Sequence, residues 1–235
     1  MTNEHISSAF DTDLEAVQAQ IMKMGGLVED AIRLGMKSLE TRDADLAQQV
    51  RAADAGIDAL EETINEGAAR IIALRAPTAI DLRLILSVIK IGGNLERIGD
   101  YAKNMAKRCE VLSAAAPISD SIGTLRRMTR AVEGMLKDAL DAYIHRDAAL
   151  AADVIARDVD VDQMYNALFR ELLTFMMEDP RNITACLHLH FIAKNTERMG
   201  DHVTSIAEQV IYLATGKHPD EARPKADTTS STFGV

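Results

Sequence analysis

The stretch Ile91-Gly-Gly-Asn-Leu-Glu-Arg-Ile-Gly-Asp100 recurs further along the chain as Ile192-Ala-Lys-Asn-Thr-Glu-Arg-Met-Gly-Asp201. The two copies lie 101 residues apart at both ends, and charged as well as apolar positions match. Helical periodicity would reproduce only the apolar positions, so the matching Asn, Glu, Arg, Gly and Asp residues indicate a duplicated unit. We therefore expect a fold in which one unit is used twice.

The segment before each stretch is duplicated as well. Its matching positions in the first copy are Arg42, Asp43, Leu46, Val50, Asp54 and Asp58, and in the second copy Arg146, Asp147, Leu150, Val154, Asp158 and Asp162. The offset here is 104 residues instead of 101. The two copies should therefore differ in length at the turn between the two matching segments.

Apolar residues recur at alternating steps of three and four along both copies, which is typical of the buried seam of packed helices. This pattern predicts three helices in the first copy, at residues 14–41, 43–74 and 78–112. Asp43 is placed to cap the second helix, and Thr78 with Asp81 resembles a capping box for the third. Short breaks between long helices favour antiparallel neighbours, and hence a three-helix bundle.

The second copy follows the same plan after the small, Pro-containing stretch 113–119. Its expected helices run to about His145, from Asp147 to about Glu178, and from Pro180 to about Thr215, where Gly216 ends the last one. The predicted fold class is all-α, with two tandem antiparallel three-helix bundles. The predicted divisions are residues 6–114 for the first repeat, 117–216 for the second, and 217–235 for a disordered C-terminal tail.

Composition agrees with helices and limits the function classes. Aromatic residues make up only 4%, Trp is absent and 11 Met are present, which favours helices over sheets. The net charge of -10 disfavours nucleic acid as a partner. The most apolar stretch, 82–91, contains Arg83 and Lys90 and is too short for membrane insertion, so we expect a cytoplasmic protein. The widely separated Cys109 and Cys186 are expected to be buried free thiols.

Acidic residues stand out against this helical background. Four pairs lie at i,i+4 spacing: Asp54 with Asp58, Glu96 with Asp100, Asp158 with Asp162, and Glu197 with Asp201. Like charges at this spacing cost about 0.2–0.5 kcal/mol per pair, so four pairs at repeated positions suggest a compensating cation. If the second and third helices of each unit are antiparallel neighbours, four carboxylates meet at the edge of each bundle.

Oxygen-only ligands favour hard cations such as Mg²⁺, Mn²⁺ or iron, while zinc also accepts carboxylates, and several carboxylates can bridge more than one ion. The alternative is a solvated acidic face that is partnered by Arg97 and Arg198. The duplication of all four pairs favours the metal site. The absence of a Glu-x-x-His motif argues against a ferritin-like di-iron oxidase.

Gly99 and Gly200 lie inside these acidic pairs, although glycine costs about 1 kcal/mol relative to alanine in a helix interior. We therefore expect a neighbouring helix or a ligand to approach closely there. The run Cys186-Leu-His-Leu-His190 is interpreted as helix packing, because histidines two residues apart point to different sides of a helix. His202, which follows Asp201, is a weaker candidate for the second cluster.

Taken together, the repeated Asn-x-Glu-Arg-(Ile/Met)-Gly-Asp, the Asp-x-x-x-Asp of the preceding helix and the duplicated helical plan resemble the PhoU family across about residues 6–216. The resemblance implies two similar three-helix bundles whose (Glu/Asp)-x-x-x-Asp motifs bind metal ions or multinuclear clusters. It assigns Asp54, Asp58, Glu96 and Asp100 to one cluster and Asp158, Asp162, Glu197 and Asp201 to the other. The metals it implies are divalent ions or iron (Fe, Zn, Mg or Mn).

The resemblance also implies regulation instead of catalysis. PhoU-like proteins restrain the phosphate-starvation response when phosphate is plentiful, by contacting the ATPase of the phosphate importer and the phosphate sensor histidine kinase. We therefore expect a cytoplasmic negative regulator, a homodimer, that is recruited to the inner membrane through these partners and is not an enzyme. The alternatives are a carboxylate-bridged dinuclear metal enzyme and a metal-free helical adaptor.

Overall fold

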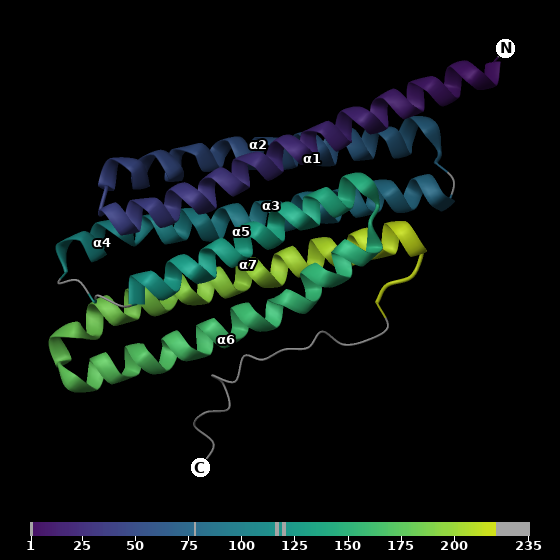
Figure 1. Cartoon of the computed structure of the whole chain (residues 1–235). Helices are drawn as coiled ribbons and strands as arrows, with labels where there is room; N and C mark the ends of the chain where they lie inside the picture. Colours follow the sequence, from purple (N-terminus) through teal and green to yellow (C-terminus); the bar gives the residue numbers. More distant parts are fainter. Residues whose placement is uncertain (1, 78, 116–117, 119–120, 220–235) are drawn as a thin grey trace.

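Six long helices form nearly all of the described chain (Figure 1). The computed structural model describes residues 2–77, 79–115, 118 and 121–219. The long helices are α1 (Thr2–Thr41), α2 (Ala44–Arg75), α3 (Ala79–Lys107), α5 (Ser121–His145), α6 (Ala148–Glu178) and α7 (Ile183–Thr215). Two short pieces, α4 (Cys109–Ala114) and the 3-10 turn η1 (Pro180–Asn182), complete them. These ranges contain no strand, so the predicted all-α class is confirmed.

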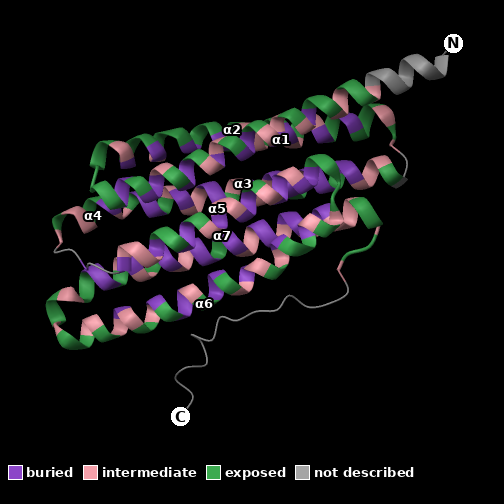
Figure 2. Ribbon diagram, in the orientation of Figure 1, coloured by how far each residue is buried: buried purple, intermediate pink, exposed green. Residues whose placement is uncertain are grey.

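The long helices form two three-helix bundles, as the duplicated seam predicts. Helices α1, α2 and α3 pack on one another, and so do α5, α6 and α7. The two bundles lie side by side, with α3 against α7 and α1 against α5 (Figure 1). Buried residues follow the inner faces of the helices (Figure 2), and one continuous apolar core extends through both bundles. This continuity follows from packing between the repeats, which the pattern within each repeat does not specify.

The helix ends are set by the same chemistry in both repeats. Asp43 accepts a hydrogen bond from the backbone N–H of Leu46 at 2.9 Å, which confirms the predicted cap of α2. The equivalent Asp147 accepts from Ala149 and Leu150 at 2.9 and 3.0 Å. The preceding residues Arg42 and Arg146 have φ values of 54° and 52°, so both turns pass through the left-handed region. The turn geometry is therefore duplicated together with the sequence.

The third predicted helix differs from the structure in one respect. It is interrupted at Arg108, so residues 109–114 form the separate helix α4. The Arg108 N–H donates to the carbonyl of Met105 in an i−3 bond, which tightens the last turn of α3. The guanidinium of Arg108 lies over the ring of Phe191 in α7, 4.4 Å from its centroid. The break thus coincides with a contact between the bundles.

Two expectations fall outside the described residues. They concern Thr78 of the predicted capping box and residues 220–235 of the predicted disordered tail. At the preceding boundary, Gly216 ends α7 with a φ of 79°, as predicted. Among the residues that the structure describes, no helix combines the length and apolar character needed to cross a membrane.

Replacement of Asp147 by alanine should lower the free energy of unfolding by about 1 kcal/mol, because two N–H groups of α6 lose their acceptor. Asp160→Ala, at an exposed position inside the same helix, should change it by less than about 0.5 kcal/mol. Denaturant unfolding followed by circular dichroism measures both values. Equal values for the two variants would contradict the capping role.

Candidate functional site

The acidic pairs of the first repeat meet across α2 and α3. Lys103 of α3 forms ion pairs with Asp54 of α2 and with Asp100 of its own helix, the latter at 3.5 Å. A Cβ placed on Gly99 would lie 3.9 Å from Asp54 Oδ1, so this carboxylate lies beside the α3 backbone. The negative charge of Asp100 also contributes to raising the pKa of Asp58 and of Glu96. The four predicted residues are therefore brought to one place.

The second repeat places Asp158, the equivalent of Asp54, in the same way. A Cβ on Gly200 would lie only 2.8 Å from Asp158 Oδ1, closer than real Cβ contacts allow. The Asp158 carboxylate of α6 therefore packs against the α7 backbone at Gly200. Along α7, Gly200 lies one residue before Asp201 and three residues after Glu197. Gly99 is also crowded, since its Cβ would lie 3.0 Å from Ile57 Cδ1. The close helix approach expected at both glycines is confirmed, and the preceding helix makes it.

Several of these carboxylates are buried more deeply than expected for a bundle edge. Asp54 and Asp158 are each only 4% exposed, and Asp162 and Glu197 are buried as well. The three- and four-residue spacing of apolar positions predicts that Ala53 lies in the buried seam between Val50 and Ile57. The structure places Asp54 there instead and leaves Ala53 exposed. The prediction for Ala53 is wrong, because the Asp54 side chain packs beside the α3 backbone at Gly99 and forms an ion pair with Lys103 of that helix.

Negative charge is concentrated in the first cluster. The pKa of Asp58 is raised, first by burial and then by the charge of Asp54, while Lys103 opposes the shift. The pKa of Glu96 is raised by burial and by Asp100, and Glu61 adds to the effect. Ionised carboxylates are therefore less favourable here than in water, and a proton or a cation relieves them. Sequence reasoning missed Glu61, although it follows Asp58 by three residues on the same helix.

Each cluster contains a lysine that the repeat pattern did not reveal. The Asp54 hydrogen bond raises the pKa of Lys103, so this ammonium group stays charged. In the second repeat, Lys194 Nζ lies 2.8 Å from Glu197 Oε1 and 4.9 Å from the centroid of the Tyr165 ring. In the second repeat Thr204 stands at the position of Lys103, and in the first repeat Gly93 stands at the position of Lys194. The two lysines therefore reach their clusters from different positions of the repeat.

The donor set suits a hard metal ion, since it consists of carboxylates drawn from two helices in each bundle. Within the described ranges, however, no three Asp, Glu, His or Cys side chains converge as they stand on a position where one ion could be held. Lys103 and Lys194 instead supply the positive charge next to Asp54 and Glu197. Coordination of one ion by three of these side chains would therefore require them to rearrange.

The histidines and cysteines have other surroundings. His190 lies against the rings of Tyr165 and Phe169, with centroids 6.0 and 5.2 Å away, which supports the packing interpretation. His202 reaches across to the first bundle, where its Nδ1 lies 2.8 Å from Asn94 Oδ1. Asn94 therefore lies at the contact between the bundles. Both cysteines are buried and free, as predicted.

Comparison with known proteins agrees with this architecture. A family model described as the PhoU domain matches residues 21–109 and again residues 125–210. A relative from Caulobacter vibrioides, named phosphate-specific transport system accessory protein PhoU homolog, is 45% identical over 227 residues. The alignment covers 97% of this chain and 99% of that relative.

Solved structures show the same fold. The crystal structure of PhoU from Pseudomonas aeruginosa matches with a TM-score of 0.85 and 42% identity, covering 88% of this chain and 100% of the other. The phosphate transport system regulatory protein PhoU from Streptococcus pneumoniae matches with a TM-score of 0.83 and 27% identity, covering 90% and 100%. The double occurrence of the domain agrees with the duplication found in the sequence.

The glycine at the second cluster gives a direct test of the packing. Gly200→Ala should lower the free energy of unfolding, by about 1–3 kcal/mol, because its Cβ displaces the Asp158 carboxylate. Gly134→Ala in α5, where a Cβ meets nothing within 4 Å, should instead raise it by about 0.5–1 kcal/mol. Chemical denaturation of both variants measures the difference. A stabilising Gly200→Ala would show that Asp158 does not need the gap.

Proposed function

The chain belongs to the PhoU family, and on that premise we propose that it is a metal-binding negative regulator of phosphate uptake and of the phosphate-starvation response. The names of its relatives support a role in regulating phosphate uptake, since they describe accessory and regulatory proteins of phosphate transport. These similarities extend over nearly the full length of both chains. The same names favour a regulatory role over an enzymatic one.

The proposed partners are the ATPase of the phosphate importer and the phosphate sensor histidine kinase. In this account the chain is cytoplasmic and is recruited to the inner membrane through these proteins, as a homodimer. The long helices offer extended outer faces, which suit protein contacts better than a small substrate. Leu187 and Phe191 of α7 are exposed apolar residues on one such face.

The observation that supports the metal-binding part is the proximity of duplicated carboxylates from two helices, with Asp54 beside Gly99 and Asp158 beside Gly200. Burial and mutual repulsion raise the pKa values of Asp58 and Glu96, and this makes a bound cation favourable. A bound ion supplies positive charge that the carboxylates of two helices share. The candidate residues are Asp54, Asp58, Glu96 and Asp100 in one bundle, and Asp158, Asp162, Glu197 and Asp201 in the other.

One observation favours the metal-free adaptor as a second candidate. Lys103 and Lys194 already balance part of the negative charge of their clusters. If these contacts are permanent, Lys103 serves to hold α2 to α3 through Asp54. Lys194 pairs with Glu197 on its own helix and holds α7 to α6 through its contact with the Tyr165 ring. The metal content of the purified protein distinguishes the metal-binding regulator from the metal-free adaptor.

Protein purified without chelators should contain iron, zinc, magnesium or manganese in at least stoichiometric amount, as measured by elemental analysis. The double variant Asp100→Asn/Asp201→Asn should lose most of this metal, because each bundle loses one ligand. Glu62→Gln/Asp160→Asn is the matched control, since it removes the same charge from exposed positions on α2 and α6. Metal-free wild-type protein, or equal metal in both variants, would support the adaptor.

The regulatory role is tested separately in the cell. Deletion of the gene should switch on a phosphate-starvation reporter while external phosphate is high, and the wild-type gene supplied in trans should restore repression. The reporter signal is compared with that of the parent strain in the same medium. A reporter that stays fully repressed in the deletion strain would count against negative regulation, whatever the metal content of the protein.

A further inference from the structure

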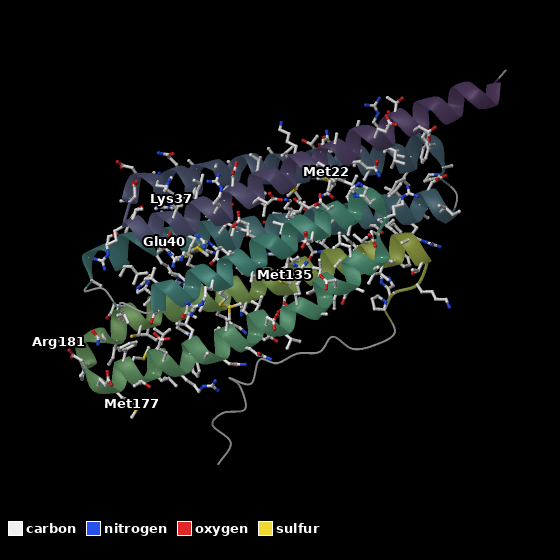
Figure 3. All side chains as sticks on the ribbon, viewed as in Figure 1. Met22, Lys37, Glu40, Met135, Met177 and Arg181 are labelled. Atoms are coloured by element: carbon white, nitrogen blue, oxygen red, sulfur yellow. The ribbon has the colours of Figure 1, made fainter. Side chains whose placement is uncertain are left out.

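A groove of about 290 Å³ runs between α1 and α5, on helices that do not carry the carboxylate clusters. Its charged lining residues are Arg33, Lys37 and Glu40 of α1, and Arg126, Arg130 and Glu133 of α5. Lys37 and Glu40 lie on the part of α1 that approaches its C-terminal end (Figure 3). Four cationic side chains thus share one groove in a protein whose net charge is -10.

The basic residues are arranged as two like-charged pairs. Arg33 with Lys37, and Arg126 with Arg130, lie at i,i+4 spacing, so each pair occupies one helix face. The faces belong to neighbouring helices and line the same groove. Such pairs repel one another on isolated helices, and placing two of them opposite each other increases the repulsion. A groove built in this way favours an anion.

Acidic neighbours compensate only part of this charge. Arg126 reaches Glu40 across the groove at 3.5 Å, and Arg33 pairs with Asp30 on its own helix. Within the described part of the chain, no ion pair occurs for Lys37 or Arg130. With Asp30 counted beside the lining carboxylates Glu40 and Glu133, the four cations of the groove exceed the carboxylates by one.

The duplication does not explain these cations. At the offset of 104 residues that relates Arg42 to Arg146, the position of Lys37 corresponds to Asp141. The positions of Arg126 and Arg130 correspond to Met22 and Gly26. Three of the four cations are therefore present at only one end of the seam between α1 and α5. The bundle forms without them at the other end, so they are not needed for helix packing.

The residue types indicate the class of anion. Three of the four cations are arginines, whose planar guanidinium groups match the oxygens of phosphate in bidentate hydrogen bonds, while lysine contributes a point charge. The groove has room for an inorganic phosphate ion or for the phosphate groups of a nucleotide. We propose that the groove between α1 and α5 binds a phosphate group through Lys37, Arg126 and Arg130. This site does not depend on metal binding or on the proposed partners.

Calorimetric titration of the full chain tests the site, in low-salt buffer without other oxyanions. Inorganic phosphate is titrated in one experiment and magnesium-free ATP in another. Tighter binding of inorganic phosphate identifies the free ion as the ligand, and tighter binding of ATP identifies a phosphate ester. Both outcomes support the site. The absence of binding by either compound at millimolar concentration would overturn it.

Variants locate the binding in the groove. Lys37→Glu/Arg130→Glu should raise the Kd of the tighter ligand by at least about tenfold, which is about 1.4 kcal/mol. Lys23→Glu/Arg127→Glu makes the same charge change at exposed positions of α1 and α5 outside the groove, and should raise the Kd less than about threefold. Equal losses in the two double variants would show that only overall charge matters, and would refute the site. Lys37→Gln/Arg130→Gln should also weaken binding, and circular dichroism checks that all variants are folded.

Discussion

The close approach of the second and third helices in each repeat is the constraint on which the rest of the structure depends. At Gly200 the missing side chain leaves room for the Asp158 carboxylate, and at Gly99 for Ile57 and Asp54. A Cβ at Gly200 would displace the Asp158 carboxylate, and a Cβ at Gly99 would crowd Ile57. The same gap therefore determines the packing of the bundle and the burial of its acidic residues, which connects the fold to the candidate metal site.

Burial of these carboxylates makes the clusters electrostatically unfavourable unless positive charge lies nearby. In the first bundle Lys103 provides it, and in the second Lys194 does so from another position, next to Tyr165. The two clusters share their carboxylates but differ in their neighbours, because Glu61 of the first corresponds to Tyr165 of the second. We therefore expect their cation affinities to differ.

The sequence was sufficient to predict the six long helices, the Asp43 cap and the duplicated carboxylates, because these follow from local periodicity and from matches between the repeats. The pattern predicted Ala53 in the seam, where the structure places Asp54, since it treats an acidic residue as exposed. It also missed Lys103, Lys194 and the groove between α1 and α5. These features depend on side chains that meet across helices, and the two repeats do not share them.

The central claim is that carboxylates from two helices of each bundle bind cations. Since carboxylates from two helices of each bundle come near one another only in the folded protein, an ion that binds them would stabilise it, by about 2.7 kcal/mol at a concentration one hundred times the Kd. The most direct measurement is the Tm of chelator-treated protein with and without added Mn²⁺ or Fe²⁺. Tm should rise by several degrees with the metal, and the rise should disappear when chelator is restored. An unchanged Tm at saturating metal concentrations would contradict this claim.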